Sequence, residues 1–141
     1  MTDPLPFTVD HVGLAVRDLD AAIERHVRLL GARLVSVEDV PGHGVREALL
    51  TLDSSGTAVQ LLAATGDDTP VGRFLRRRGE GMHHLAYAVR DLESALAHLA
   101  ASNPPVVPVP PGVSRGSGGA GVAFLPPAAF GGVLVELVER V

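Results

Sequence analysis

The sequence predicts an α+β fold built from two tandem βαβββ modules. The first observation is an internal duplication, because VDHVGLAVRDLDAA at Val9–Ala22 aligns with MHHLAYAVRDLESA at Met82–Ala95. In this alignment His11 falls on His84, and both copies continue with Ala-Val-Arg-Asp-Leu. A single duplication of this length indicates two related halves, in which aligned residues occupy equivalent places.

The second observation is that the similarity continues near the end of each half. GTAVQLL aligns with GVLVELV, where Gly56 falls on Gly132 and Gln60 on Glu136. The third is that each half has the same order of elements, with one helical pattern after the first of several β-rich runs. We therefore expect a single domain over residues 1–141, with module one at about 7–66, a connecting helix at about 69–79 and module two at about 81–140.

Module one begins with an apolar, β-rich run that predicts a strand at Phe7–Val16. Asp18 is a suitable N-cap for a helix over Leu19–Leu30, whose apolar residues recur at helical spacing, and Gly31 follows its end. Pro-Gly and Asp-Ser-Ser-Gly turns separate the remaining β-rich runs. These predicted strands are Arg33–Val40, Gly44–Leu52 and Thr57–Ala64.

The connecting helix has Thr69 as its N-cap, Pro70 at its first position and Gly79 after its last turn. In module two, Asp91 caps the helix. The helix is predicted at Leu92–Ser102 and the strands at His83–Val89, Val106–Val109, Gly121–Leu125 and Val133–Glu139. The Pro- and Gly-rich stretch from 103 to 119 predicts a long loop around the strand Val106–Val109.

The composition excludes several classes of protein. A hydrophobic fraction of 46% with 20% charged residues is typical of a globular protein, and a net charge of −4 argues against a nucleic-acid partner. The absence of cysteine excludes disulfides, thiolate metal sites and cysteine nucleophiles. No apolar run reaches the ~20 residues of a membrane helix, and MTDPLPF does not resemble a signal peptide. We therefore expect a cytoplasmic protein without membrane partners.

Four potential metal ligands occupy the two aligned pairs: His11, Gln60, His84 and Glu136. Each lies on a predicted strand, and strand alternation places small residues on the same face as both histidines. If each half curls into a cupped sheet, the four polar groups point into a shared metal-binding cleft. Two imidazoles, an amide oxygen and a carboxylate suit a divalent ion such as Co, Ni, Mn, Fe or Zn.

A simpler interpretation exists for each ligand alone, because a buried His or Gln is usually a hydrogen-bonded core residue. Glu136 would then pair with an arginine such as Arg46. The coincidence of four potential ligands at aligned positions favours the metal site.

Glu47 is a second carboxylate in an apolar stretch, VREALLTL, and strand alternation turns it inward while Arg46 faces out. A carboxylate beside a metal, but not bound to it, can act as a general base. His83 has the opposite parity to His84 and is expected beneath the helix layer. The connecting helix carries an arginine cluster that indicates a solvated face or a phosphate-binding surface. Its members are Arg73, Arg76, Arg77 and Arg78.

Four segments together resemble the methylmalonyl-CoA epimerase family of the vicinal oxygen chelate (glyoxalase/bleomycin resistance/dioxygenase) superfamily. They are DHVGLAVRDLDAA, EDVPGHGVREALL, VQLLAATGDDTPVGRFLRRRGEGMHHLAY and GGVLVELVE, and they cover nearly the whole chain. The more specific parts are Gly44–Glu47, the Asp-Asp-Thr-Pro helix start and Arg78–His84. The resemblance implies a glyoxalase-like cupped sheet around a divalent metal, Co²⁺ before Mn²⁺, Ni²⁺, Zn²⁺ or Fe²⁺, commonly in a homodimer.

The same resemblance implies roles for individual residues. The family's metal ligands match His11, Gln60, His84 and Glu136, and its proposed bases match Glu47 and Glu136, on opposite sides of the C2 carbon of an acyl-CoA substrate. The implied reaction is epimerisation of (2R)- and (2S)-methylmalonyl-CoA by removal and return of the C2 proton through a metal-stabilised enolate.

The sequence departs from this family after the penultimate predicted strand, where members usually read Phe-Leu-His-Pro-Lys. Pro126 and Ala128 stand in place of the histidine and the lysine, and no basic residue lies between Ala120 and Gly132. The apolar segment Pro126-Pro127-Ala128 leaves the range of acyl-CoA substrates open.

Three rival functions remain within the same superfamily. A glyoxalase I-type lactoylglutathione lyase also isomerises its substrate on a divalent ion. An extradiol dioxygenase binds Fe(II) with two histidines and a glutamate and has no amide ligand, so the presence of Gln60 argues against this function. A metal-free small-molecule or antibiotic-binding protein would lack the ligand set that this sequence keeps.

Overall fold

The computed structural model describes residues 7–52 and 56–141, and these form the predicted α+β fold. The predicted turn at 53–56 lies mostly outside the described residues. The helices are α1 (Leu19–Leu30), α2 (Pro70–Arg78) and α3 (Leu92–Ala100), with short 3-10 turns η1 (Pro41–His43), η2 (Ser117–Gly119) and η3 (Pro127–Phe130). The strands are β1 (Thr8–Ala15), β2 (Arg33–Val40), β3 (Val45–Thr51), β4 (Ala58–Ala64), β5 (Gly81–Val89), β6 (Ser114–Arg115), β7 (Gly121–Leu125) and β8 (Val135–Glu139).

The chain forms two compact units. One is His11–His83, and the other combines His84–Val141 with the described residues of Met1–Asp10. The single-domain organisation expected from the sequence stays a prediction. No described helix has the length and apolarity that crossing a membrane requires.

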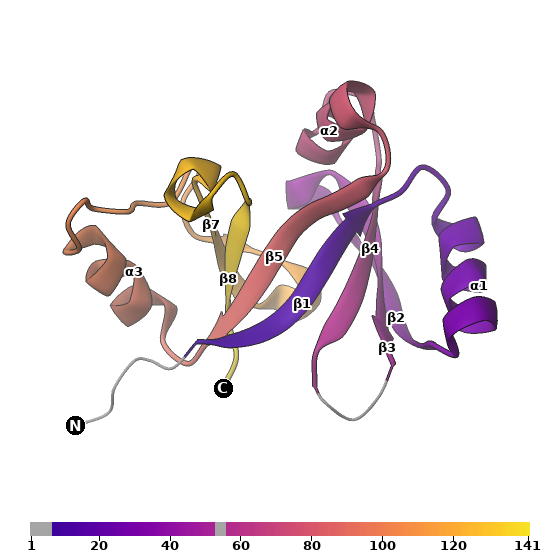
Figure 1. Cartoon of the computed structure of the whole chain (residues 1–141), viewed down its shortest axis with the longest axis horizontal. Helices are drawn as coiled ribbons and strands as arrows, with labels where there is room; N and C mark the ends of the chain where they lie inside the picture. The colour runs from indigo at the N-terminus through magenta and orange to yellow at the C-terminus, as the bar shows by residue number, and fades with distance from the viewer. Residues whose placement is uncertain (1–6, 53–55) are drawn as a thin grey trace. The chain divides into compact units, whose positions relative to one another are not determined.

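In the unit His11–His83, the strand order is β2-β3-β4-β1, with β1 parallel to β4 and the other pairs antiparallel (Figure 1). Side chains alternate between the two faces of this sheet. On one face α1 contributes Leu19 to a core with Leu50 and Leu61. On the opposite face α2 contributes Val71 and Leu75, which pack against a second core cluster. The strand residues of that cluster are Ala15, Val40, Val45 and Leu62.

The capping residues predicted for the helices are confirmed. The Asp18 carboxylate accepts a hydrogen bond from the Ala21 N–H at 3.0 Å, and Gly31 ends α1 with φ of 68°, a conformation that favours glycine. Asp91 caps α3 in the same way, with its carboxylate 3.0 Å from the Ser94 N–H. These contacts explain why the helices begin where the sequence predicts.

In the other unit the strand order is β5-β8-β7-β6, with β5 parallel to β8 and the remaining pairs antiparallel (Figure 1). One face packs against α3, where Leu92 and Ala95 join a core with strand residues of β5, β7 and β8. The opposite face carries a smaller apolar cluster of Ala86, Val122 and Val138. This second face also carries the polar residues of the candidate site.

The predicted strand at Val106–Val109 is wrong. The short strand at this edge is β6, Ser114–Arg115, which pairs with β7. Val109 does donate one hydrogen bond to the Phe124 carbonyl, at 2.9 Å. Pro108 and Pro110 flank it and have no N–H, so the ladder does not continue through this segment.

Candidate active site

One face of the sheet in His11–His83 carries three of the predicted site residues. Gln60 on β4 pairs with Gly13 on β1 and with Leu49 on β3, so these three residues face the same way. His11 lies two residues before Gly13, and Glu47 two residues before Leu49, so both lie on that face as well. His11, Gln60 and Glu47 are 2%, 5% and 5% exposed. Burying three polar side chains on a mainly apolar face is costly unless each has a partner or a ligand.

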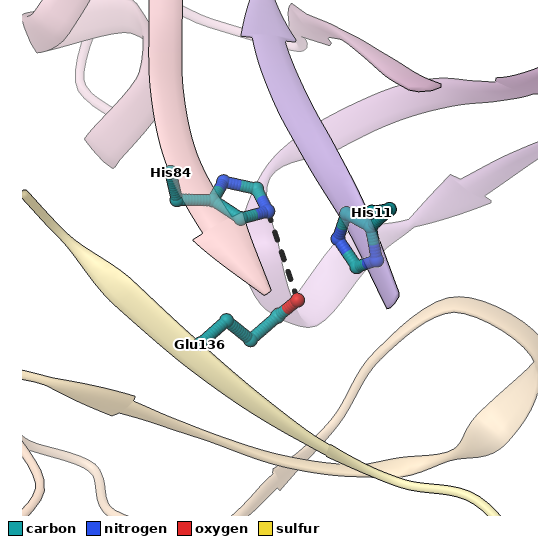
Figure 2. A group of neighbouring side chains, drawn as sticks. All are labelled: His11, His84 and Glu136. Atoms are coloured by element: carbon teal, nitrogen blue, oxygen red, sulfur yellow. Dashed lines mark ion pairs between the residues drawn. The ribbon is translucent and has the colours of Figure 1, made fainter. Parts of the chain in front are cut away.

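The corresponding face of the other unit carries His84 and Glu136. Ala86 pairs with Glu136 across the parallel strands β5 and β8, and His84 lies two residues before Ala86 on the same face. Figure 2 shows the His84 imidazole turned toward the Glu136 carboxylate, with Nε2 and Oε1 3.6 Å apart. Both side chains are buried, and the Phe124 ring lies edge-on to the imidazole at 5.7 Å.

The 3.6 Å separation bears on what this pair can hold. A direct N–H···O hydrogen bond spans about 2.7–3.2 Å, so the two atoms lie beyond that range. Two ligands bound at roughly 2.0–2.2 Å to one divalent ion, and separated by an angle near 110–120°, lie about 3.4–3.7 Å apart. The pair therefore fits two ligands of a shared cation better than it fits an ordinary hydrogen bond.

Each unit thus supplies one buried histidine and one buried oxygen donor from its equivalent strands. His11, which Figure 2 draws on β1, His84 and Glu136 are all residue types that ligate metal ions. Gln60 occupies the place on β4 that Glu136 occupies on β8. Two imidazoles with oxygen donors are a chemistry that suits divalent transition metals.

Arg46 does not take the role of counter-ion considered for Glu136. Its guanidinium contacts Asp39, with Nη1 3.2 Å from Oδ1, on the exposed face of β2 and β3. Arg46 therefore faces outward, as predicted, while Glu47 is buried.

Sequence reasoning missed an ion pair close to Glu136. Arg140 donates two hydrogen bonds to the Asp10 carboxylate, each at 3.0 Å. The hydrogen bond to Asp10 is the main reason that the pKa of Arg140 is raised, and the charges of Asp10 and Glu136 add to it. The available signal was positional, because Asp10 directly precedes His11 and Arg140 follows Glu136 by four residues.

His83 lies beneath α2, as the sequence predicts. Its ring meets the Phe74 ring edge-on, with centroids 5.0 Å apart. Burial lowers the pKa of His83 to about 4, so the imidazole is neutral at neutral pH. Its contacts are those of a packed side chain of the helix layer.

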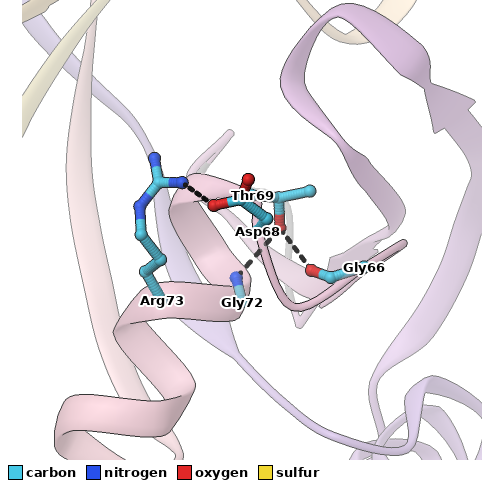
Figure 3. A network of polar contacts seen from close by, with 5 residues as sticks. All are labelled: Gly66, Asp68, Thr69, Gly72 and Arg73. Carbon is cyan, nitrogen blue, oxygen red and sulfur yellow. Dashed lines mark hydrogen bonds and ion pairs between the residues drawn. The ribbon is translucent and has the colours of Figure 1, made fainter.

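The start of α2 is fixed by a polar network (Figure 3). Thr69 accepts a hydrogen bond from the Gly72 N–H at 3.0 Å and donates one to the Gly66 carbonyl at 2.8 Å. Arg73 forms an exposed ion pair with Asp68 at 3.0 Å, which accounts for one member of the arginine cluster. The Arg78 guanidinium lies over the Phe74 ring, 5.7 Å from its centroid. Arg76 and Arg77 are exposed, which is typical of a solvated helix face.

Comparisons with known proteins show the family to which the chain belongs. Residues 10–124 match the pattern of the Glyoxalase/Bleomycin resistance protein/Dioxygenase superfamily. The ethylmalonyl-CoA/methylmalonyl-CoA epimerase of Cereibacter sphaeroides is 36% identical over 139 residues, which cover 93% of this chain and 96% of that protein. The mitochondrial methylmalonyl-CoA epimerase of Homo sapiens is 34% identical and covers 93% of this chain, with 73% of its own length matched.

Solved structures give the same result. The crystal structure of methylmalonyl-CoA epimerase from Mycobacterium tuberculosis matches with a TM-score of 0.88 and 39% identity, over 94% of this chain and 87% of that one. A methylmalonyl-CoA epimerase in complex with methylmalonyl-CoA and NH4+ matches with a TM-score of 0.88 and 35% identity, over 96% and 95%. The chain therefore belongs to the glyoxalase/bleomycin resistance protein/dioxygenase superfamily and, within it, to the methylmalonyl-CoA epimerase family of isomerases.

Proposed function

We propose that this enzyme interconverts (2R)- and (2S)-methylmalonyl-CoA by removing the C2 proton from one face and returning a proton to the other. The observation that carries the proposal is the buried set of acid–base and ligand side chains, His11, Gln60, His84, Glu136 and Glu47, in a member of this family. Related structures contain the substrate or 2-nitronate-propionyl-CoA, which supports a CoA thioester as the ligand here.

We propose further that His11, Gln60, His84 and Glu136 hold a divalent metal ion, with Co²⁺ as the first candidate. The donor set and the 3.6 Å separation between His84 and Glu136 support this assignment. When bound, such an ion supplies Lewis-acid stabilisation of the negative charge that develops on the substrate as the C2 proton leaves. The protein's own part is to keep the two imidazoles neutral and correctly oriented as ligands.

Glu47 is the proposed base on one side of C2. It is buried on β3, and its neighbours on the same face, Val45, Leu49 and Leu62, are apolar. Exclusion of water removes hydration that would otherwise stabilise the carboxylate, which makes proton uptake easier. Glu136 is the proposed acid–base group on the other side and is also a ligand.

We propose a wider substrate range than methylmalonyl-CoA alone. η3 and the residue before it form the apolar run Pro126-Pro127-Ala128, and Phe130 is partly exposed. The Cereibacter sphaeroides relative is named for ethylmalonyl-CoA as well as methylmalonyl-CoA. We therefore propose that ethylmalonyl-CoA is also epimerised.

A homodimer and a cytoplasmic location are also proposed, on the basis of the sequence and its family. In the dimer, the exposed apolar residues Leu34, Val35 and Val37 of the edge strand β2 are available for subunit contact. Light scattering during size-exclusion chromatography tests the dimer, since a monomeric mass at micromolar concentration would contradict it.

The decisive experiment follows isotope uptake at C2. One stereoisomer of methylmalonyl-CoA is incubated in deuterated water with untagged enzyme of known metal content, and deuterium at C2 and formation of the other stereoisomer are measured. We expect both with the wild type and a loss of at least about 100-fold in kcat with Glu47→Gln. Glu24→Gln, on the exposed face of α1, is the matched control.

Two outcomes would overturn the proposal. Formation of lactoylglutathione from its thiohemiacetal precursor, with no epimerisation, would assign a glyoxalase I-type activity instead. Tight binding of a small molecule by metal-free protein, with no turnover of either acyl-CoA, would assign a binding protein.

A further inference from the structure

The strand beside the proposed base presents a second carboxylate to it. In the antiparallel pair β2 and β3, Glu38 lies directly opposite Glu47. Residues in such positions project to the same face with Cβ atoms about 4.5–5.5 Å apart, so the two carboxyl groups can reach each other. Glu38 plays no part in the activity proposed above.

The adjacent pair shows that this register brings side chains into contact. Asp39 lies opposite Arg46 on the other face, and their side chains form an ion pair at 3.2 Å. That pairing of opposite charges is the favourable cross-strand arrangement. The pair Glu38 and Glu47 instead places two carboxyl groups opposite each other, close enough for a proton to pass between them.

Burial distinguishes the two carboxyl groups. Glu47 is 5% exposed, whereas Glu38 is half-buried on β2, the edge strand of its sheet. Every residue of β2 before Glu38 is exposed. Glu38 therefore lies between the buried base and the solvent.

The other groups on this face are mainly apolar, and the buried polar ones are His11 on β1 and Gln60 on β4, which are proposed above as metal ligands. β4 contributes Leu62 opposite Glu47, and α2 contributes Val71 and Leu75. The turn η1 between β2 and β3 contributes one titratable side chain, His43. Any account of proton movement from Glu47 must therefore consider Glu38 and His43.

We propose that Glu38 is the route by which Glu47 exchanges protons with solvent. This role rests on the proposed function, since Glu47 must first take the C2 proton. The substrate's C2–H bond breaks and an O–H bond forms on Glu47. That proton then passes to the Glu38 carboxylate and from there to water. Glu38 is thus a positioning residue that acts through Glu47.

The first test needs no substrate and so remains valid if the assigned reaction is wrong. The side-chain carboxyl carbons of glutamate are labelled with ¹³C, and Glu47 is titrated by NMR in the wild type and in Glu38→Gln. We expect the titration midpoint of Glu47 to fall by at least about 0.5 pH unit in the variant, because a neutral amide removes the like charge. Asp39→Asn, the next residue on β2 but on the other face, is the control and should leave the midpoint unchanged.

The second test follows exchange during turnover. Each stereoisomer of C2-deuterated methylmalonyl-CoA is incubated in ordinary water, and loss of deuterium from unconverted substrate is compared with the rate of epimerisation. For the stereoisomer whose proton goes to Glu47, we expect the ratio of exchange to turnover to fall at least about threefold in Glu38→Gln. The acid limb of kcat/KM should also move to lower pH.

The proposal is overturned if Glu38→Gln changes neither the Glu47 titration nor the exchange ratio, or if Asp39→Asn changes them equally. It is also overturned if His43→Gln, rather than Glu38→Gln, lowers the exchange ratio. If Glu38→Gln does not fold, Glu38→Asp retains the charge and withdraws the carboxyl group by one methylene. Glu38→Asp should then lower the ratio of exchange to turnover. It should lower the titration midpoint of Glu47 by less than Glu38→Gln is expected to, because the negative charge is kept.

Discussion

Glu136 lies in a strand whose flanking residues, Val135 and Leu137, are both almost fully buried. A carboxylate in such a place is destabilising unless charge or hydrogen bonds compensate for its lost hydration. The positive charge of Arg140 and the facing His84 supply part of that compensation. The divalent cation proposed above would supply more.

Replacing a ligand tests this reasoning. We expect His84→Ala to weaken divalent-metal binding by at least about 10-fold, because one of four donors is lost. Competition with a coloured chelator measures the affinity without any need for activity. His98→Ala, on the exposed face of α3, should bind metal like the wild type. Equal affinities for both variants would remove His84 from the ligand set.

The buried imidazole of His83 predicts a pH-dependent stability. Its pKa is lowered from 6.5 to about 4, so the unfolded chain takes up a proton at a higher pH than the folded protein does. The contribution of His83 is therefore fully present above pH 6.5 and is lost as the pH falls toward 4. That contribution is at most about 3 kcal/mol.

Urea unfolding of chelator-treated protein at several pH values checks this expectation. His83→Gln, which does not ionise, should lose less stability between pH 6.5 and 4 than the wild type does. Parallel stability curves for the two proteins would show that acid acts elsewhere.

The burial of the candidate site residues, and the sheet face on which each lies, were predictable from two simple features. Duplication identified His11 with His84 and Gln60 with Glu136, and strand alternation placed each of them on a buried face. The pair of Asp10 with Arg140 was not predictable in the same way, because its partners are 130 residues apart and the duplication does not relate them to each other. Likewise Glu38 gave no signal until the register of β2 and β3 was known.

At the scale of single elements, α2 depends on its N-cap. Thr69→Ala removes the hydrogen bond to the Gly72 N–H and should lower the free energy of unfolding by about 1 kcal/mol. Thr69→Ser keeps the hydroxyl group and should lie close to the wild type. Urea denaturation measures both, and equal losses would show that the methyl group of Thr69, rather than its hydroxyl, stabilises the helix start.

Gly72 is needed in α2 for a different reason. A Cβ atom at this position would lie 2.3 Å from the Gly66 carbonyl oxygen and 2.9 Å from that of Asp67, which is closer than real contacts allow. Gly72→Ala should therefore destabilise the protein by roughly 1–3 kcal/mol, although alanine normally favours a helix. Gly42→Ala, where nothing lies within 4 Å, is the control. If Gly72→Ala is as stable as the wild type, the backbone at Gly66 and Asp67 can move away from the added methyl group without a cost in stability.

The elements themselves were predicted to different extents. The bounds of α1, β2 and β7 agree with the structure, because capping residues, turns and apolar periodicity coincide there. The stretch from 103 to 119 was predicted less well. This stretch contains several prolines, which remove backbone hydrogen-bond donors but do not show which of the other residues pair. In addition, β6 consists of two residues, Ser114 and Arg115, too few to give a recognisable pattern.

At the scale of the whole molecule, the fold was predictable because the duplication shows the order of elements twice. The long-range ion pair of Arg140 with Asp10 is the feature that this order does not contain. Its side chains are 43% and 16% exposed, so solvent screens part of the attraction. We expect Arg140→Gln to lower the free energy of unfolding by about 1 kcal/mol.

A double-mutant cycle isolates that contribution. Arg140→Gln, Asp10→Asn and the double variant are compared by thermal or urea unfolding, and a coupling energy of about 0.5–1.5 kcal/mol is expected because both hydrogen bonds are charge-assisted. Arg28→Gln with Glu24→Gln, an exposed pair within α1, should give a smaller coupling. If the changes in the free energy of unfolding caused by Arg140→Gln and Asp10→Asn are additive, the contact between the two side chains does not stabilise the protein.

The sequence separation of that ion pair also determines when the protein can finish folding during translation. Everything that His11–His83 needs has been synthesised by residue 83, so this half can begin to fold while translation continues. Asp10 must wait until Arg140 emerges, since 130 residues separate them. Assembly of the half that contains Glu136 is therefore a late event, and nascent chains stalled before β8 lack one of the proposed metal ligands.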